Sequence, residues 1–461
     1  MPELAEVQTV SDTLKNLIQD RKIIDIDVLY PNIIVGDVEE FKKKMIGQHF
    51  RRFLRRGKYL LFEMDDLLFV SHLRMEGKYY YEDFDTKDNK HSHIIFYLDN
   101  GKKLAYNDTR KFGRMELLPK RDNYNEFKDL GPEPFSEDFN LDYCLNVLNN
   151  EKKSIKALLL DQHFVAGIGN IYADEIIFAI GIHPETAANL MDEETIEKMI
   201  VATRDILNEA IAMGGTTIRS YTSSLGVNGR FQQKLKVHQK EGECCPLCQT
   251  KILKTRVAGR GTYYCPHCQK KTLHIAVTGS IGSGKTTVMN YLKQHYNYNY
   301  FLADEEVALM YRNDEKLKTI IHKLYPAVFV NDEISHSLLA ELIFNDSKAK
   351  KVIEELVFKR VLETYKKASM HADVMIAEMP LLFEAKLESY FEHILVISSS
   401  KKTAIERLKK KGLSQSDAIR RQKQQTSLKT KLDKADYHIV NNGNIEELYD
   451  KIEVWIDKYV R

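Results

Sequence analysis

Four cysteines near the middle of the chain have the spacing of a metal site. Cys245 and Cys248 form one Cys-Pro-x-Cys pair, and Cys265 and Cys268 form a second such pair sixteen residues further on. Four thiolates at this spacing complete the tetrahedral coordination that Zn²⁺ takes in structural sites. The sequence therefore predicts one structural zinc ion. Cys244, which directly precedes the first pair, is a competing ligand, although the repeated Cys-Pro turn favours Cys245.

Two disulfide bonds are the alternative use of these cysteines, and they require an oxidising compartment. The chain begins Met-Pro-Glu-Leu-Ala-Glu, without a basic and then apolar signal segment, and it has no apolar run as long as a membrane span. We therefore expect a cytoplasmic protein with reduced thiols and without a membrane partner. The remaining cysteine, Cys144, is most simply a small buried apolar residue.

A phosphate-binding motif begins eleven residues after the last of these cysteines. It reads Gly279-Ser-Ile-Gly-Ser-Gly-Lys-Thr286, and a β-branched run over residues 273–278 precedes it. In this spacing, backbone N–H groups and the N-terminus of the following helix bind phosphates, the lysine neutralises their charge, and the threonine hydroxyl binds Mg²⁺. The motif predicts a site for ATP with Mg²⁺. The expected ATP-binding residues of the motif are Gly282, Ser283, Gly284, Lys285, Thr286 and Thr287.

The charge of the chain is unevenly distributed. The net charge of +2 hides eight lysines or arginines without an acid over residues 42–58, and ten against two acids over residues 230–274. Such basic blocks are usually solvated surface. The first block carries aromatic residues and the second surrounds the metal motif, and both features favour a polyanionic partner.

Hydrophobic periodicity places these motifs on elements. The 461 residues suffice for about three domains of roughly 150 residues each. Residues 4–20 have a helical pattern, and residues 23–118 contain alternating runs typical of strands. Residues 136–213 read as helices, whereas apolar β runs alternate with charged helices from residue 273 onward, which predicts a parallel sheet covered on both faces. The expected fold class is multidomain, with an α+β part followed by an α/β part.

Six motifs run in order through the first part of the chain and identify its family. They are Met1-Pro-Glu-Leu-Ala-Glu-Val7, Arg56-Gly-Lys-Tyr-Leu-Leu61, Ser71-His-Leu-Arg-Met-Glu-Gly-Lys78, Asp108-Thr-Arg-Lys-Phe-Gly-Arg114, the segment 160–175 and Gly259-Arg-Gly-Thr-Tyr-Tyr-Cys265. Residues 1–271 thus resemble the bacterial formamidopyrimidine-DNA glycosylases. The resemblance implies a β-sandwich catalytic domain at residues 1–134, a helix–two-turn–helix DNA-binding domain at 135–235 and a zinc finger at 236–271, which together embrace damaged double-stranded DNA.

The first residues of the chain offer the expected catalytic groups. If the initiator methionine is removed, Pro2 presents a secondary amine that can attack C1′ of a damaged nucleotide, and the resulting iminium makes the adjacent proton acidic enough for strand cleavage. The resemblance implies that Glu3 is the general acid, that Lys58 contacts phosphate and assists β-elimination, and that Arg260 grips phosphate during the second elimination. Without the resemblance, these would be a terminal residue, a first-turn helix acid and two solvated charges.

The resemblance also implies a set of DNA contacts. An enzyme that acts on a base within a duplex flips that base out and fills the gap. Met75, Arg110 and Phe112 match the residues that fill this gap, although Met and Phe in β runs usually belong to a core. Residues 214–229 resemble the segment that closes over the extruded lesion. The remaining DNA-binding residues implied by the resemblance are Glu6 at the damage site and the backbone-contacting His91, Lys156 and Asn170.

A second set of motifs follows the phosphate loop. The motifs are Leu302-Ala-Asp-Glu305, Leu339-Ala-Glu-Leu-Ile-Phe344, Met379-Pro-Leu-Leu-Phe-Glu384, Arg407, residues 421–425 and Ala435-Asp-Tyr-His-Ile-Val-Asn-Asn-Gly443. Residues 273–461 thus resemble dephospho-coenzyme A kinase, a P-loop fold with a parallel sheet. The resemblance implies that Asp304 accepts the proton of the ribose 3′-hydroxyl and that Arg407 binds ATP, because phosphoryl transfer depends on positioning and charge neutralisation.

The kinase part departs from its family at the acceptor end. Leu302 stands where the family has the first acid of Asp-x-Asp, His336 replaces an arginine, and Val357-Phe358 replaces a His-Pro pair. The phosphate loop is intact, so the sequence supports nucleotide binding more firmly than turnover.

We therefore predict a bifunctional enzyme. One part is a DNA glycosylase and AP lyase for oxidised purines such as 8-oxoguanine and formamidopyrimidines, and the other phosphorylates dephospho-coenzyme A with ATP. An alternative makes the second part a nucleotide-binding regulatory module without kinase turnover. Another makes the first part a damage-binding module without catalysis, against which the retained Pro2, Glu3, Lys58 and Arg260 argue.

Overall fold

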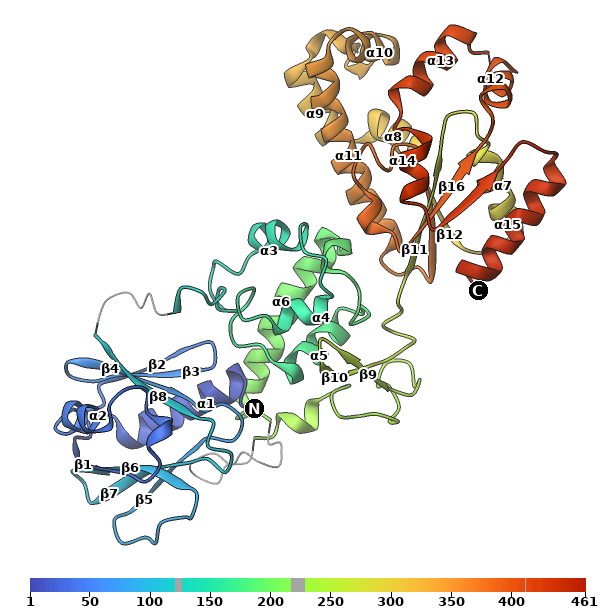
Figure 1. Cartoon of the computed structure of the whole chain (residues 1–461). Coiled ribbons are helices and arrows are strands. Elements are labelled where there is room, and N and C mark those ends of the chain that lie inside the picture. The colour runs from blue at the N-terminus through green and yellow to red at the C-terminus, as the bar shows by residue number, and fades with distance from the viewer. Residues whose placement is uncertain (121–126, 217–228, 411) are drawn as a thin grey trace. The chain divides into compact units, whose positions relative to one another are not determined.

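The computed structural model describes the chain as two compact units (Figure 1). One unit contains residues 1–188 and 193–269, and the other contains residues 189–192 and 270–461. The description covers residues 1–120, 127–216, 229–410 and 412–461, without the side chains at 418, 421, 423 and 424. Most of the predicted lesion-closing segment, residues 217–228, therefore lies outside the described residues.

Two four-stranded antiparallel sheets form the first part of the glycosylase-like unit. Their strands are β1 (Ile23–Val28), β6 (Ser92–Leu98), β7 (Lys102–Asn107) and β5 (Lys78–Asp83) in one sheet, and β2 (Arg52–Arg56), β3 (Tyr59–Glu63), β4 (Leu67–His72) and β8 (Arg114–Pro119) in the other. Apolar side chains of both sheets share one core, in which the rings of Phe69 and Phe96 lie 5.6 Å apart. This arrangement confirms the predicted sandwich.

Helix α1 (Leu4–Ile18) closes the same core, and its apolar side chains recur every three or four residues. Two short elements, η1 (Pro31–Ile33) and α2 (Val38–Met45), follow β1. The catalytic candidates Pro2 and Glu3 directly precede α1, so the packing of this helix positions the N-terminus of the chain.

A helical region follows the sandwich. It contains α3 (Leu141–Leu148), α4 (Ile155–Leu160), α5 (Asn170–Ala179), η3 (Ala188–Leu190), α6 (Glu193–Ala212) and η4 (Phe231–Lys234). The side chains of Asn140 and Ser154 cap α3 and α4 by accepting backbone N–H groups. Helix α5 is buried from Ile171 to Phe178, which makes it the central helix of this region.

A β-hairpin carries the predicted finger arginine. Strands β9 (Leu253–Val257) and β10 (Arg260–Tyr264) pair antiparallel. Ala258 and Gly259 connect them with φ values of 49° and 72°, as a two-residue hairpin turn requires. Arg260 therefore stands at the tip of the hairpin.

The second unit contains a five-stranded parallel sheet, as predicted. Its strand order is β12 (Asn299–Leu302), β15 (Val374–Glu378), β11 (Leu273–Gly279), β16 (His393–Ser398) and β17 (Tyr437–Val440). Helices lie on both faces of this sheet, with α7 (Lys285–His295) and α15 (Ile445–Tyr459) together on one of them (Figure 1). Parallel strands buried on both faces explain the continuous apolar runs of the sequence.

The remaining elements of the unit are helical or short. They are α8 (Ala303–Asn313), α9 (Glu315–Leu324), η5 (Pro326–Val328), β13 (Phe329–Val330), β14 (Glu333–Ile334), α10 (His336–Asn345), α11 (Ser347–Ser369), η6 (Glu388–Tyr390), α12 (Lys401–Lys410), α13 (Gln415–Gln424) and α14 (Leu428–Asp433). Among the helices that the structure describes, none is both long enough and apolar enough to cross a membrane.

Candidate active sites

The acid predicted to act as general acid is held by the N-terminus of α5. Glu3 is buried, and its carboxylate accepts hydrogen bonds from the backbone N–H groups of Gly169 at 2.8 Å and Ile171 at 3.0 Å. A Cβ at Gly169 would lie 2.3 Å from Cδ of Glu3, so any larger residue there would have to displace this carboxylate. A positive helix N-terminus thus faces a buried carboxylate. Pro2 is also buried, directly before Glu3.

Lys58 completes a buried group of opposite charges. Its ammonium donates to the carbonyl oxygen of Ile168 at 2.8 Å, immediately before the residues that bind Glu3. Burial raises the pKa of Glu3 above its ordinary value, while the charge of Lys58 opposes that rise. Burial likewise lowers the pKa of Lys58, opposed by Glu3 and Glu6 and aided by the charge of Arg260. Each group is therefore closer to its neutral form than it would be in water.

Glu133 positions Lys58, and the sequence reasoning missed it. Its carboxylate accepts the N–H of Gly57 at 2.6 Å and pairs with Arg55 at 2.6 Å and Arg56 at 3.2 Å. These contacts fix the turn between β2 and β3 that leads into Lys58. Only the position of this acid within a Pro-Glu-Pro segment distinguished it in the sequence.

Glu6 lies inside the protein rather than on an open damage site. Its carboxylate accepts the N–H of Glu3 at 2.9 Å, the hydroxyl of Tyr172 at 2.7 Å, and both the N–H and the hydroxyl of Thr216. Glu6 therefore links the N-terminus, α5 and the last described residue before 217–228.

Lys156 differs from its predicted role as a contact to the DNA backbone. Its side chain has an exposed fraction of 0% and is paired with the equally buried Asp174. Its ammonium also donates to the carbonyl oxygen of Asn170 at 3.2 Å. A fully buried ammonium has no surface to present to a phosphate, so Lys156 instead fixes the start of α5.

Asn170 connects α5 to the finger hairpin. Its side-chain amide donates to the carbonyl oxygen of Gly261 at 2.9 Å, next to Arg260. Arg260 itself is exposed, and after burial its charge is a smaller cause of the lowered pKa of Lys58. The structure thus brings Glu3, Lys58, Asn170 and Arg260 to one end of α5.

The predicted gap-filling residues lie on exposed loops of the sandwich. The guanidinium of Arg110 stacks on Phe112 at 4.9 Å from the ring centre, and Phe112 remains 49% exposed. Asp108 shapes this loop by accepting the N–H groups of Arg110, Phe112 and Gly113. Met75 is half-buried. Phe112 is therefore not part of the core, and Asp108 holds the loop that carries it; its gap-filling role stays a prediction.

His91 is half-buried. It lies beside the same loop, since its carbonyl oxygen accepts the N–H of Asp108 at 3.1 Å. Among the described residues, the side chain of His91 makes no hydrogen bond with Glu3 or Lys58.

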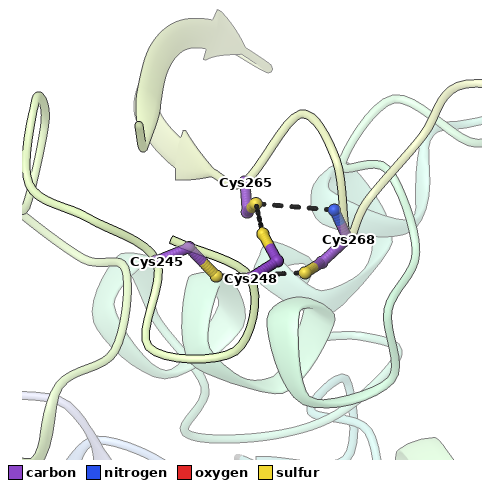
Figure 2. Close-up of side chains that lie close together, drawn as sticks. All are labelled: Cys245, Cys248, Cys265 and Cys268. Carbon is purple, nitrogen blue, oxygen red and sulfur yellow. Dashed lines mark hydrogen bonds between the residues drawn. The ribbon is translucent and has the colours of Figure 1, made fainter. Parts of the chain in front are cut away.

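The four predicted zinc ligands converge, as Figure 2 shows. Their ligand atoms all lie within 4.8 Å of one another, with the Sγ atoms of Cys248 and Cys265 3.4 Å apart. Four sulfur donors in this arrangement suit tetrahedral Zn²⁺. Cys244 is exposed, and its sulfur contacts Lys251, so the competing assignment is wrong. Cys144 is buried, as predicted.

The phosphate loop of the second unit has the geometry of an anion cradle. Gly282 and Gly284 have φ values of 80° and 98°, which favour glycine. A Cβ at Gly284 would also lie 2.3 Å from Nδ2 of Asn441. The ammonium of Lys285 donates back to the carbonyl oxygens of Gly279 and Ser280, and Lys285 begins α7. The loop thus has the backbone form that binds anions at a helix N-terminus, and the Lys285 ammonium folds back over it.

Two residues from distant segments, Arg407 and Asn441, bind the phosphate loop through the carbonyl oxygen of Ser283. Asn441 donates to the carbonyl oxygen of Ser283 at 2.8 Å, and Arg407 donates to the same oxygen at 3.3 Å and to Asn441 at 3.2 Å. Arg407 was predicted from its motif, but the buried role of Asn441 was not. The side chain of Arg421 lies outside the described part of the structure.

A cavity of about 800 Å³ extends from the loop. Asp304, Arg407, Asn441 and all the predicted ATP-binding residues except Ser283 line it. Burial raises the pKa of Asp304 above its ordinary value, and the charge of Lys285 opposes that rise. A carboxylate and a phosphate-binding lysine thus face one space.

A second cavity of about 200 Å³ is also lined by Asp304. Its walls are mostly apolar and include Val357 and Phe358, the pair that replaces His-Pro. Leu302 packs against the core of the sheet, and the rings of His336 and Tyr311 lie 6.1 Å apart. Val357 and Phe358 thus give apolar walls to a cavity that shares Asp304 with the larger cavity at the loop.

Comparisons with known proteins agree with this division. Residues 1–115, 130–222 and 242–271 match the formamidopyrimidine-DNA glycosylase N-terminal domain, the formamidopyrimidine-DNA glycosylase H2TH domain and the zinc finger found in FPG and IleRS. Residues 273–447 match dephospho-CoA kinase.

Whole relatives of the first part are also similar. The chain is 43% identical over 269 residues to the formamidopyrimidine-DNA glycosylase of Oceanobacillus iheyensis, covering 58% of this chain and 96% of the relative. It is 46% identical to that of Streptococcus mutans over 267 residues, covering 58% and 98%. A solved complex between the Lactococcus lactis Fpg and DNA containing an abasic site is 43% identical with a TM-score of 0.56, covering 58% of this chain and all of that one.

These matches cover nearly the whole length of each relative, and the kinase domain follows where they end. Over residues 1–271 the chain belongs to the formamidopyrimidine-DNA glycosylase family, and it continues into a dephospho-CoA kinase domain.

Proposed function

We propose that the chain is a bifunctional enzyme that excises oxidised purines, cleaves the resulting abasic site, and phosphorylates the 3′-hydroxyl of dephospho-coenzyme A with ATP. The observation that carries the first activity is the convergence of Glu3, Lys58 and the Arg260 hairpin on the N-terminus of α5, next to Pro2. The intact phosphate loop facing Asp304 supports the second.

In the glycosylase reaction, removal of Met1 frees the Pro2 amine, which attacks C1′ of the lesion nucleotide. Glu3 donates a proton to the departing base or the opening sugar, and its raised pKa keeps the acid protonated to higher pH. The resulting iminium acidifies the C2′ proton, whose loss expels the 3′-phosphate. Lys58 and Arg260 neutralise the phosphates on either side of the cleaved bonds.

The protein also has to hold the duplex open. Arg110 and Phe112 enter the gap left by the flipped nucleotide, supported by Met75, and Asp108 holds their loop by accepting its backbone N–H groups. Asn170 and His91 contact the DNA backbone. Glu6 and Lys156 act from inside, as supports of the N-terminus and of α5. The four-cysteine cluster holds Zn²⁺ and stabilises the finger.

Borohydride trapping tests the nucleophile. The full chain incubated with DNA containing 8-oxoguanine and borohydride is expected to give a covalent complex, because reduction fixes the Schiff base. Pro2→Gly removes the buried ring that orients the amine and is expected to abolish the complex. Equal trapping by Pro2→Gly would contradict the assignment of Pro2, and an untrapped wild-type chain would sink the lyase itself.

In the kinase reaction, the backbone N–H groups of residues 282–287 bind the ATP phosphates and Lys285 neutralises their charge. Thr286 supplies a hydroxyl ligand for Mg²⁺, which offsets the charge of the phosphates when bound. Arg407 lies behind Ser283 and adds positive charge. Asp304 accepts the proton of the acceptor hydroxyl as that oxygen attacks the γ-phosphorus and ADP leaves.

A phosphorylation assay tests this activity against the regulatory-module alternative. Coenzyme A is expected to form from dephospho-coenzyme A and ATP, and Lys285→Ala is expected to reduce its formation by more than about 100-fold. Lys293→Ala changes an exposed lysine of the same helix and serves as the matched control. ATP binding without product in the wild-type chain would favour the regulatory module.

We also propose the domain limits 1–134, 135–235, 236–271 and 273–461, and a cytoplasmic location. The limits are supported by the positions of the two sheets, the helical region, the hairpin and the parallel sheet. Free thiols that bind zinc are stable in a reducing compartment, which supports the location.

A further inference from the structure

His238 is a buried histidine that the reaction itself does not use. It lies in the segment that enters the zinc finger, and its exposed fraction is 4%. Its Nδ1–H donates to the carboxylate of Asp174 at 2.6 Å, and Asp174 belongs to α5. The other oxygen of Asp174 is paired with Lys156. The carboxylate of Asp174 thus binds both His238, at the start of the finger, and Lys156, whose ammonium also binds the carbonyl oxygen of Asn170.

The backbone of the same segment is anchored to the next residue of α5. The carboxylate of Glu175 accepts three consecutive backbone N–H groups, from Lys236 at 2.8 Å, Val237 at 3.0 Å and His238 at 2.9 Å. These bonds satisfy a buried carboxylate and fix the direction in which the His238 side chain leaves the backbone. The histidine is therefore held from both its main chain and its ring.

The opposite side of the ring faces the hairpin that carries Arg260. The ring of His238 packs edge-on against Tyr263 of β10, with centres 5.2 Å apart and planes at 71°. Tyr263 is three residues from Arg260 on the same strand. His238 is thus bonded to α5 on one side and packed against β10 on the other.

Helix α5 is also the element that holds the catalytic acid. Gly169 and Ile171 bind Glu3 through backbone N–H groups, and Asn170 binds Gly261 of the hairpin through its side chain. Contacts at both ends of β10 therefore determine where Arg260 lies relative to Glu3. The Asn170 contact is at the tip of the hairpin, and the His238 contact is at its base.

We propose that His238 is a positioning residue for Arg260, which holds the β9–β10 hairpin in register with the end of α5 that binds Glu3. This inference rests on the proposed glycosylase and lyase function. Loss of the hydrogen bond to Asp174 frees the hairpin to shift, and a displacement of about 1 Å near reacting groups can cost about 100-fold in rate. The Pro2 amine does not depend on this contact, because Pro2 precedes α1 and is not part of the hairpin.

Two substitutions separate the hydrogen bond from the packing. His238→Phe keeps a ring against Tyr263 and removes the donor to Asp174, whereas His238→Asn keeps a short N–H donor. His49→Phe is the matched control, because His49 makes an equivalent Nδ1 contact of 2.7 Å with Asp65 in the sandwich. All variants are prepared as the full zinc-loaded chain, and their zinc content is measured.

The decisive measurement is a double-mutant cycle between His238→Phe and Arg260→Ala on DNA with a preformed abasic site. We expect each single substitution to slow the second elimination by about 10- to 100-fold relative to the first elimination. The double variant should be no slower in the second elimination than Arg260→Ala alone. His238→Asn should recover most of the rate, and His49→Phe should match the wild type. Borohydride trapping through Pro2 should change less than about twofold in every variant.

The salt dependence of DNA binding gives a second readout. Loss of one phosphate contact lowers the slope of log affinity against log salt by about 0.9, so His238→Phe and Arg260→Ala should lower it equally. Three results would overturn the positioning role. The losses from the two substitutions could be additive, or the ratio of second-elimination to first-elimination product could be unchanged in His238→Phe. Trapping and elimination could also fall by the same factor. If His238→Phe loses zinc, the same cycle with Tyr263→Leu in its place, which removes the ring that His238 packs against, decides between these outcomes. Absence of trapping in the wild-type chain would instead refute the proposed function.

Discussion

At the scale of single residues, the glycosylase site is a small group of buried charges whose surroundings oppose their ionisation. Burial raises the pKa of Glu3 and lowers the pKa of Lys58, while their mutual attraction limits both shifts. A carboxylic acid with a raised pKa beside an amine with a lowered pKa is easier to protonate, and the amine easier to deprotonate, than either group in water. Burial, which opposes the charging of both groups, thus favours the forms that proton transfer requires, a protonated Glu3 and a less basic Lys58.

The raised pKa of Glu3 predicts a specific pH profile. Excision of 8-oxoguanine should be fastest where Glu3 is protonated and should fall as the pH rises through its raised pKa, which lies above the ordinary value of 4.5. Glu3→Gln should lower excision by about 100- to 10,000-fold, as expected for loss of a general acid. Single-turnover excision measured across pH checks both points. A Glu3→Gln profile that keeps the same falling limb would contradict the assignment.

Asp304 has the opposite requirement, because a base acts in its ionised form. Since burial raises its pKa, phosphorylation of dephospho-coenzyme A should be lost on acidification at a higher pH than for an exposed carboxyl. Asp304→Asn should lower turnover by about 100-fold or more while the affinity for ATP stays the same. Steady-state kinetics with a separate ATP titration tests this. An equal loss of ATP affinity would assign Asp304 to nucleotide binding instead.

At the scale of elements, one helix organises the glycosylase site. The first turn of α5 binds Glu3 through its backbone, the finger through Asn170 and the buried Lys156 through a carbonyl oxygen. The sequence motif over residues 160–175 was one of the signs of the family. It did not reveal that Gly169 lies against the side chain of Glu3, which comes from the start of the chain.

Gly169→Ala tests how closely the start of α5 packs against the side chain of Glu3. The added Cβ would lie 2.3 Å from Cδ of Glu3, so we expect unfolding free energy to fall by about 1–3 kcal/mol and excision to fall with it. Gly261→Ala is the control, because its nearest heavy atom would lie at 3.6 Å. Urea denaturation followed by circular dichroism gives the comparison. Equal stabilities of the two variants would show that Glu3 moves aside without cost.

The predicted elements and the observed ones agree where a pattern repeats. Helix α1, strands β1, β3 and β6, and the parallel strands β11, β15 and β16 were expected from apolar periodicity. Lys156 was not placed correctly, because a lysine is normally exposed, and only the fold shows that Asp174 can neutralise it in the interior.

At the scale of the whole molecule, two chemistries share one chain through two compact units. Each unit contains its own core and the residues of its own site. The single tryptophan of the chain, Trp455, is buried in the kinase unit and therefore reports on that unit alone.

Removal of zinc should separate the two activities. Stripping the metal with a chelator, followed by return of Mg²⁺, should abolish strand cleavage, because the cysteine cluster stabilises the finger that carries Arg260. Phosphorylation of dephospho-coenzyme A and the fluorescence of Trp455 should be unchanged. Restored zinc should return strand cleavage, and a parallel loss of both activities would contradict independent units.

The sequence by itself determined the chemistry of both sites. Metal spacing, the phosphate loop and ordered motifs depend on residues close together in the chain, so the ligand cysteines, Lys285 and the family of residues 1–271 were all readable from it. Only the tertiary structure decided what surrounds those residues. The burial of Lys156, the support of Lys58 by Glu133 and the contact of His238 with Asp174 join segments far apart in sequence. Such contacts depend on how whole elements pack, and no local pattern encodes them.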